Sequence, residues 1–360
     1  MFSFPIPPRH PRRSIGSGGF SLVEIMVGMV IGMLGIIVMM QIFALAEGQK
    51  RTTTGGGDAQ NNGAIALYGL QRDIRQSGYG ISNFGLIGCN VLLRPGLTLT
   101  AMAPTTIYPA GMLNPLIPAG DANTDSLLVV YGNTNGSPQG DGITATTVAP
   151  HTSYPVQTPT SFAPGDNVVA LPQARPTPCN LTMTQVASVV SPSVNVTTGS
   201  AMTNGATLYN LGQSPQIQAY AIRGGNLTVC DFTANDCSLA ANTGNSAIWV
   251  PIASNIVSMR AEYGHDANTP MDGIVDGFDQ VTPATACNWV KTSAVRLVLV
   301  ARSGQYEKIA VTTVAPAWLG SAGTPVILTA DANWQNYRYK VFQTVVPIRN
   351  VVWMGVQAGC

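Results

Sequence analysis

The chain has few charged side chains and few histidines. Asp, Glu, Lys and Arg make up 10% of its 360 residues, against about 25% in typical domains, so we expect a neutral, loop-rich surface suited to work outside the cell. His10 lies in an arginine-rich start, and His151 and His265 lie in Pro- and Gly-rich stretches. The G-x-S-x-G, H-E-x-x-H and phosphate-binding glycine-loop motifs are absent. The sequence therefore predicts that the protein is not an enzyme.

The charge balance also gives no sign of a nucleic-acid partner. The formal net charge is +1, from 18 basic and 17 acidic residues. Three of the basic residues, Arg9, Arg12 and Arg13, lie within the first 19 residues, which contain no acid. From residue 20 onward the chain thus has 15 basic and 17 acidic residues, a net charge of −2. A basic surface for nucleic acid is not indicated.

One apolar run is long enough to cross a membrane. Residues 25–46 contain no charged side chain, and as a helix they would extend about 33 Å, enough for a hydrocarbon core of about 30 Å. The leading arginines predict a cytoplasmic N-terminus. We therefore expect a single pass through the inner membrane, with the rest of the chain outside the cytoplasm.

The start of this run holds a carboxylate, Glu24. A secretory signal has its small residues and cleavage site after the apolar core, whereas here the small residues 16–19 come before it. A charged group at membrane depth costs about 2.5 to 3.5 kcal/mol on insertion scales, so Glu24 needs a partner. An amino group freed at Phe20 would be one, and an uncleaved signal anchor is the competing interpretation.

The stretch "GGFSLVEIMVGMVIGMLGI" resembles the prepilin signature of type IV pilins and type II secretion pseudopilins. That signature is a glycine, a cleavage point, a phenylalanine, three mostly apolar residues and a glutamate before an apolar helix. The resemblance implies that prepilin peptidase cuts between Gly19 and Phe20 and methylates the new Phe20 amine. It also implies that Glu24 pairs with the Phe20 amine of a neighbouring subunit during assembly.

The following segment predicts that the helix continues to about residue 78. Three consecutive glycines, residues 55–57, cost about 3 kcal/mol relative to alanine in a helix interior, so we expect a kink or local unwinding there. Beyond them, Ala64 and three larger apolar residues share one helical face, and Arg72, Asp73 and Arg75 lie elsewhere. This half-amphipathic helix is expected to pack on a sheet.

The remainder reads as short strands separated by loops. Residues 79–220 are rich in Pro, Gly, Thr and Asn, with strand-like runs such as "SLLVVYG", "DNVVAL" and "VASVV". From residue 221 the strand signals strengthen, with a hairpin in "IQAYAIRGGNLTVCD" and strands in "IVSMRAEYG", "AVRLVLVAR" and "YKVFQTVVPIRN". We therefore divide the chain into a leader (1–19), a helix (20–78), a loop-rich β insertion (79–220) and a β-rich C-terminal part (221–360).

Two segments resemble the minor pilins called PilW: "NNGAIALYGLQRDIRQSGYG", with its R-D-x-R element, and the C-terminal strand "YKVFQTVVPIRN". The resemblance implies an α+β, pilin-like fold in which a long N-terminal transmembrane and amphipathic helix packs on an antiparallel β-sheet with long loop insertions. Ser77 stands where the family has alanine, and the glycine triplet is unusual for it.

Six cysteines all lie on the side expected to be periplasmic or extracellular, where disulfides persist. Only Cys230 and Cys237, in "CDFTANDC", are close in sequence. We predict that they form a disulfide, and leave the other pairings open. A zinc site is the alternative, but the six-residue gap and the lack of a nearby histidine argue against it.

An acidic loop, "GHDANTPMDGIVDGFDQ", is a candidate calcium site. Oxygen ligands in a glycine-punctuated loop suit Ca²⁺, but the spacing fits an EF-type loop only with a two-residue insertion. The alternative is a solvated acidic turn. The candidate ligands are Asp266, Asn268, Asp272, Asp276 and Asp279.

The leading functional prediction is a minor pilin that helps to prime type IV pilus assembly or caps the tip, serving motility, attachment or DNA uptake. Its expected partners are other minor pilins, major pilins and prepilin peptidase, and its expected location changes from the inner membrane to a periplasmic or cell-surface pilus. The alternatives are a J-type pseudopilin of type II secretion, and a pilus-borne adhesin in which residues 91–220 bind a surface or glycan.

Overall fold

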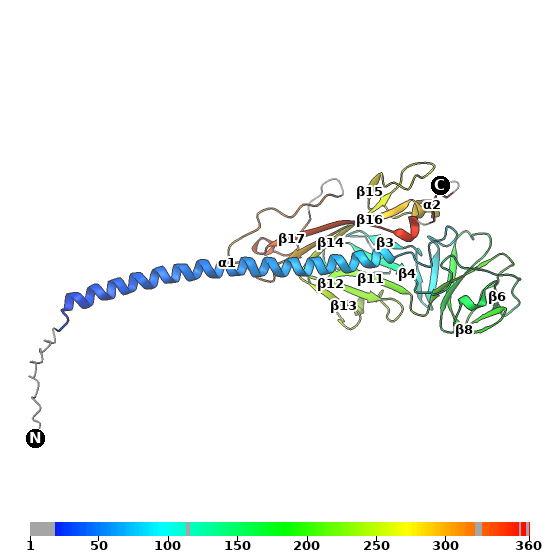
Figure 1. Ribbon diagram of the computed structural model, residues 1–360, viewed down its shortest axis with the longest axis horizontal. Helices are drawn as coiled ribbons and strands as arrows, with labels where there is room; N and C mark the ends of the chain where they lie inside the picture. The colour runs from blue at the N-terminus through cyan, green and yellow to red at the C-terminus, as the bar shows by residue number, and fades with distance from the viewer. Residues whose placement is uncertain (1–18, 113–115, 321–325, 353, 358–359) are drawn as a thin grey trace, which may run out of the picture. The chain divides into compact units, whose positions relative to one another are not determined.

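The computed structural model describes residues 19–112, 116–320, 326–352, 354–357 and 360. All but the last residue of the predicted leader, 1–19, therefore lies outside the described residues. Two compact units divide the chain between Thr54 and Gly55. Helix α1 (Leu22–Gln76) begins in the first unit and ends in the second (Figure 1).

The first unit consists, within the described residues, of the apolar part of α1 and the residues just before it. Every described side chain from residue 19 to 54 is exposed. Within the described part of the chain, α1 is the one helix long and apolar enough to cross a membrane, judged by length and composition. Such a segment fits a membrane anchor, because lipid or other helices can cover side chains that this chain leaves uncovered.

The expected break at residues 55–57 is wrong, since α1 runs through the glycine triplet without interruption. Glycine lowers the stability of a helix but does not prevent it, and a break would create new helix ends with unpaired backbone groups. Gly55 is also buried, and a Cβ built on it would lie 3.2 Å from Cβ of Ser303. Close packing therefore offsets part of the glycine cost.

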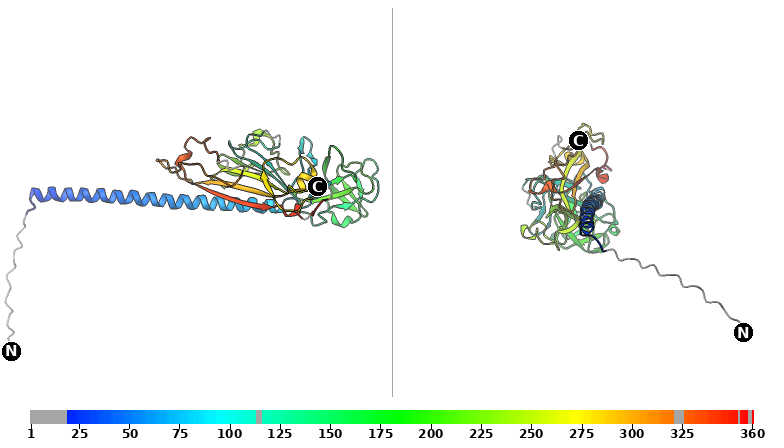
Figure 2. Two further views of the ribbon diagram at one scale, coloured as in Figure 1. Left: turned by 90° about the horizontal axis from the view of Figure 1, so that it is seen from above. Right: turned by 90° about the vertical axis from the view of Figure 1, so that its left-hand side faces the viewer.

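From Gly55 onward α1 packs on the sheets through a face that includes three of the four predicted apolar residues: Leu70 and Ile74 are fully buried, and Leu67 packs against the core. Ala64 is exposed, and the buried positions begin with small residues and include Asp73. A Cβ on Gly63 would overlap the ring of Phe342 in strand β17 (Tyr339–Pro347), which lies beside this part of the helix in Figures 1 and 2. The small residues therefore let the helix approach the sheet closely. The buried set on α1 is Gly55, Ala59, Gly63, Ala66, Leu70, Asp73 and Ile74.

The strands of the described residues form three sheets. The first has eight strands, paired in the order β2-β1-β8-β7-β10-β5, with β9 joining β8 to β6; all its pairs are antiparallel except β1 with β8. Its strands are β1 (Asn90–Arg94), β2 (Leu97–Leu99), β5 (Asp141–Gly142), β6 (Ser153–Pro155), β7 (Asn167–Leu171), β8 (Asn180–Val190), β9 (Ser193–Val196) and β10 (Thr207–Gly212).

The second and third sheets are antiparallel throughout, in the orders β13-β12-β11-β4-β3 and β15-β14-β16-β17. The five-stranded sheet has β3 (Thr105–Tyr108), β4 (Ser126–Tyr131), β11 (Gln216–Arg223), β12 (Asn226–Asp231) and β13 (Val250–Ser254). The four-stranded sheet has β14 (Ile256–His265), β15 (Gly277–Asp279), β16 (Thr292–Arg302) and β17 (Tyr339–Pro347). The described residues also form short helices: η1 (Pro159–Ser161), η2 (Ala240–Asn242), α2 (Ala286–Val290), η4 (Trp334–Asn336) and α3 (Arg349–Val352).

The α+β class and the single long N-terminal helix packed with antiparallel sheets are confirmed. The boundary between residues 220 and 221 is wrong, because it falls inside β11. The region 79–220 also contains more strands than predicted. Many of them were missed because they are short and lie between Pro and Gly turns. Short strands carry too few alternating residues to stand out in the sequence.

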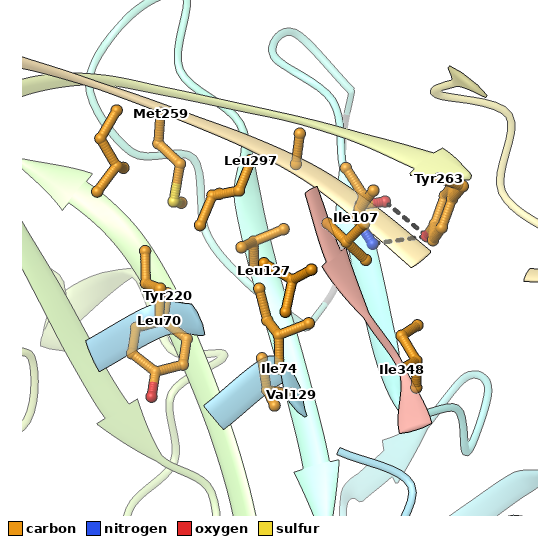
Figure 3. Close-up of a cluster of buried hydrophobic side chains, with 14 of the residues drawn as sticks. Leu70, Ile74, Ile107, Leu127, Val129, Tyr220, Met259, Tyr263, Leu297 and Ile348 are labelled. Atoms are coloured by element: carbon orange, nitrogen blue, oxygen red, sulfur yellow. Dashed lines mark hydrogen bonds between the residues drawn. The ribbon is translucent and has the colours of Figure 1, made fainter. Parts of the chain in front are cut away.

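The main core lies where the four-stranded sheet, the five-stranded sheet and the second part of α1 meet. Leu70 and Ile74 of the helix pack with Leu127 and Val129 of β4 (Figure 3). The Tyr263 hydroxyl at the end of β14 accepts a hydrogen bond from the backbone N–H of Ile107, at 2.6 Å. This core therefore holds helix and sheets together in the second unit.

Candidate functional site

The predicted processing and assembly residues lie at the start of α1. Phe20 is 80% exposed. Ser21 is the residue before the helix: its hydroxyl accepts a hydrogen bond from the backbone N–H of Glu24 at 3.2 Å, and its own N–H donates to Glu24 Oε2 at 3.4 Å. This reciprocal pair is a capping box, which satisfies two backbone donors that a helix start would otherwise leave unpaired.

The capping box gives Glu24 a role within the single chain that the sequence analysis missed. The signal was present, because Ser-x-x-Glu at the start of an apolar helix is the pattern of such a cap. Glu24 Oε2 is occupied by the Ser21 N–H, whereas Oε1 accepts no hydrogen bond from the described residues. One carboxylate oxygen therefore stays available to a donor from outside the chain.

Gly19 is not required by the local packing. A Cβ built on it would meet no atom within 4 Å among the described residues, and its backbone is not in the left-handed region. The same holds for Gly28 inside the helix. The packing of the described residues therefore neither requires nor excludes a side chain at position 19.

The predicted calcium ligands do not form one oxygen cage. Among the described residues, no three Asp, Glu, His or Cys side chains are grouped so that they could hold a metal ion. Asp266 instead accepts the backbone N–H groups of Asn268, Asp272 and Gly273, at 2.8, 2.6 and 2.7 Å. The loop is thus folded around this one carboxylate, which is 2% exposed and not solvated as the alternative interpretation expected.

The other acids of the loop also accept hydrogen bonds. Asp276 Oδ2 accepts the N–H of Ala267 at 2.8 Å, and Asp272 Oδ2 accepts from the Asn268 amide at 3.0 Å. Asp279 lies on β15, 3.7 Å from the ring of His265. The geometry fits a hydrogen-bonded acidic turn better than a metal site.

The pKa of Asp266 lies below its ordinary value. Burial raises it, but the three backbone donors, together with the charge of Lys291, outweigh that effect. Lys291 Nζ itself donates to the backbone oxygen of Asn268 at 2.7 Å, and so closes the loop from the other side.

The predicted bridge between Cys230 and Cys237 is present, closing the turn after β12. The pairings that the sequence left open are Cys89 with Cys179 and Cys287 with Cys360. The first joins residues 90 positions apart, at the point where β1 and β8 pair in parallel.

A buried polar cluster on the helix was missed altogether. Asp73 is 5% exposed, and its Oδ2 accepts a hydrogen bond from the Tyr220 hydroxyl of β11 at 2.6 Å. Its Oδ1 lies 3.4 Å from the Tyr131 hydroxyl of β4 and 3.2 Å from Nε of Arg72. The aspartate of the "QRDIR" stretch therefore ties the end of α1 to the five-stranded sheet.

Burial and the neighbouring Asp73 charge raise the pKa values of both tyrosines. For Tyr131 the pKa rises to about 12, through burial first and the charge of Asp73 second. The pKa of Tyr220 rises further for the same reasons. Both hydroxyls therefore keep their protons at neutral pH and serve as donors to the carboxylate.

Comparison with known proteins identifies one part of the chain. Residues 226–350, about a third of the chain, match the family model PilW, described as type IV pilus-assembly protein W. The match begins with β12 and includes the whole four-stranded sheet. Neither a curated protein nor a solved structure matches. Residues 226–350 are therefore similar to a family of type IV pilus-assembly proteins, and the match supports a role related to pilus assembly.

Proposed function

We propose that this chain is a minor pilin that is cleaved between Gly19 and Phe20 and enters a type IV pilus through helix α1. The observation that carries the proposal is that two independent features occur in the same chain. A chain whose C-terminal sheet matches a pilus-assembly family also has Gly-Phe and Glu24 at the start of an apolar helix. The two features lie at opposite ends of the sequence and support the same function.

The local geometry supports cleavage at Gly19. This glycine has open space around it and no backbone strain, so folding alone does not explain it. Phe20 is exposed, and the helix begins only at Leu22. A peptidase would therefore meet an extended segment ahead of the helix, and it would leave the capping box of Ser21 and Glu24 in place.

The geometry also supports pairing of Glu24 with an amine. Its free Oε1 can accept a charge-assisted hydrogen bond from the Phe20 amine of a neighbouring subunit while Oε2 keeps its cap. Pairing offsets the cost of placing a carboxylate among apolar helices, about 2.5 to 3.5 kcal/mol on insertion scales. The pair would fix the register of neighbouring helices in a fibre.

In this proposal the protein is first anchored in the inner membrane with its N-terminus in the cytoplasm. After cleavage and methylation it joins major and other minor pilins and moves to the periplasmic or surface fibre. Its role is structural, in priming assembly or capping the tip, and it is not catalytic. Motility, attachment and DNA uptake would depend on it through the pilus.

Cleavage is tested by expressing the full chain with and without a prepilin peptidase. The expected product with the peptidase is shortened by 19 residues. Gly19→Val should block the shortening, whereas Gly28→Val should not, although both glycines have open space for a side chain. Full-length protein in the presence of active peptidase, or equal cleavage of the Gly19→Val variant, would overturn the proposal.

A J-type pseudopilin is the second candidate, because it shares the N-terminal signature. It would be processed identically but would stay in the envelope. The position of the processed chain, in fibres or in the envelope, separates the two.

A further inference from the structure

A cavity of about 360 Å³ lies at one end of strands β7 and β10 of the eight-stranded sheet, next to the loop that follows β4. Its walls come from residues 133–136, 160–166 and 210–213, where β7 begins and β10 ends. None of these residues belongs to the segment that matches the pilus-assembly family. The volume falls within the range of small-molecule sites, about 300 to 1,000 Å³.

The cavity is lined by one carboxylate, that of Asp166, which is 7% exposed. Its Oδ2 accepts hydrogen bonds from the backbone N–H of Ala163 and from Nδ2 of Asn210, both at 2.8 Å. Its Oδ1 accepts none from the described residues, and no described cationic side chain forms an ion pair with it. Oδ1 is open to solvent, since it is not one of the buried side-chain atoms that lack a partner among the described residues, and it is therefore accessible to a donor on a ligand.

A β-bulge shapes the wall next to this carboxylate. The pairing of β10 with β7 shifts register between Asn210 and Gly212, and bulges of this kind redirect side chains. Asn210 thereby donates to both Asp166 and the backbone oxygen of Ser161, while its Oδ1 accepts the N–H of Gly212 at 2.7 Å. Gly212 has φ +84°, and a Cβ there would overlap Asn133. The floor of the cavity is therefore held rigidly.

The rim offers neutral groups that have no other partner. The side chains of Asn135, Thr160 and Ser161 make no hydrogen bond with the described residues, although all three line the cavity. Phe162 also lines the cavity, although it is 7% exposed and packs in a hydrophobic core. No Lys or Arg lines the space, so it lacks the groups that bind phosphate or carboxylate ligands.

We propose that this cavity binds a neutral, hydroxyl-rich small molecule of the sugar class. A sugar hydroxyl would donate to Asp166 Oδ1, and others would exchange hydrogen bonds with the amide and hydroxyl groups of the rim. The inference goes beyond the proposed pilin function and does not depend on it.

The test uses the full chain in a detergent without a sugar headgroup, because maltoside or glucoside detergents would compete. The probes are glucose, galactose, mannose and N-acetylglucosamine, followed by saturation-transfer NMR during titration. Glucosamine serves as a cationic probe. The variants are Asp166→Asn, which turns the free acceptor into a donor, and Asp141→Asn, a control for loss of a buried carboxylate outside the cavity.

A saturating signal for at least one neutral sugar, weakened about tenfold or more in Asp166→Asn and unchanged in Asp141→Asn, would support the assignment. If Asp166→Asn fails to fold, Thr160→Val on the exposed rim replaces it, with the same expected direction. No saturable signal from any neutral sugar, an equal signal in both variants, or binding of glucosamine alone would overturn the proposal.

Discussion

Replacing Tyr220 by phenylalanine removes one oxygen atom from the contact between α1 and the five-stranded sheet. The Tyr220 hydroxyl lies 2.6 Å from Asp73 Oδ2, and both residues are at most 5% exposed. Water therefore cannot readily replace the lost donor. The Tyr131 hydroxyl, at 3.4 Å from the other carboxylate oxygen, is too distant to compensate fully.

The size of the effect follows from the carboxylate that is left behind. A buried polar group deprived of its partner costs about 1 to 3 kcal/mol, and more when it is charged. We expect Tyr220→Phe to lower the free energy of unfolding by about 2 kcal/mol. For a chain of this size about 2 °C per kcal/mol is appropriate, so Tm should fall by about 4 °C.

Thermal unfolding of the full chain in detergent, followed by near-UV circular dichroism, measures this effect. Tyr131→Phe is the matched control and should lower Tm less, because its hydrogen bond is long. In an Asp73→Asn background the Tyr220→Phe change should cost less, since no charge remains to be stranded. A Tm within 1 °C of the wild type, or a larger loss in Tyr131→Phe, would refute the reasoning.

Other predictions concern different parts of the chain. Glu24→Ala should be processed but absent from sheared fibres on immunoblots; normal incorporation would contradict its assembly role. Asp266→Ala should lower the unfolding free energy by about 1 to 3 kcal/mol at pH 7, with equal wild-type melting curves in Ca²⁺ and chelator. Because its folded pKa is lowered, that stabilisation should be present above about pH 4 and lost as the pH falls further; a Ca²⁺-dependent rise in Tm would instead indicate a metal site. Replacing Cys89 and Cys179 by serine should cost about 4 to 5 kcal/mol for a 90-residue loop, and an unchanged urea midpoint would contradict this. Burial raises the pKa of Tyr209 to about 12. The free energy of unfolding that the neutral Tyr209 contributes should therefore be lost as the pH rises from about 10 to 12. In urea titrations over this pH range, Tyr209→Phe should lose less stability than the wild type, and an equal loss would contradict this.

The sequence was most informative where a pattern was long. An uncharged apolar run and a prepilin-like start predicted the N-terminal helix, and strongly β-branched runs predicted β14, β16 and β17. The hairpin of β11 and β12 was also expected, with Gly224, Gly225 and Asn226 at its turn. The turn consists of the two glycines, and Asn226 is instead the first residue of β12, paired with Arg223. Each of these elements is formed by a contiguous stretch of sequence, so the pattern of neighbouring residues is enough to predict it.

Tertiary packing decided the features that the sequence did not reveal. The glycines at 55–57 read as helix breakers, but close approach to Ser303 is compatible with a continuous helix. Asp73 read as a surface charge because nothing nearby in sequence shows that Tyr220 would meet it from 147 positions away. The predicted helical face was right at Leu70 and Ile74 but wrong at Ala64, which is exposed, and it missed the small buried residues such as Gly63 and Ala66.

Side-chain direction was equally hidden in the acidic segments. Spacing suggested that the acids from Asp266 to Asp279 bind one Ca²⁺ ion together, but their carboxylates accept hydrogen bonds from nearby backbone N–H groups instead. The cavity around Asp166 had no signal at all, because three separated segments and a β-bulge create it.

Mass spectrometry of the N-terminal peptide, taken from sheared surface fibres and from the washed envelope, tests the proposed function most directly. We predict a peptide in the fibres that begins with methylated Phe20. The same peptide confined to the envelope would favour a pseudopilin. A chain that keeps its leader from Met1 in both samples would contradict the prepilin interpretation.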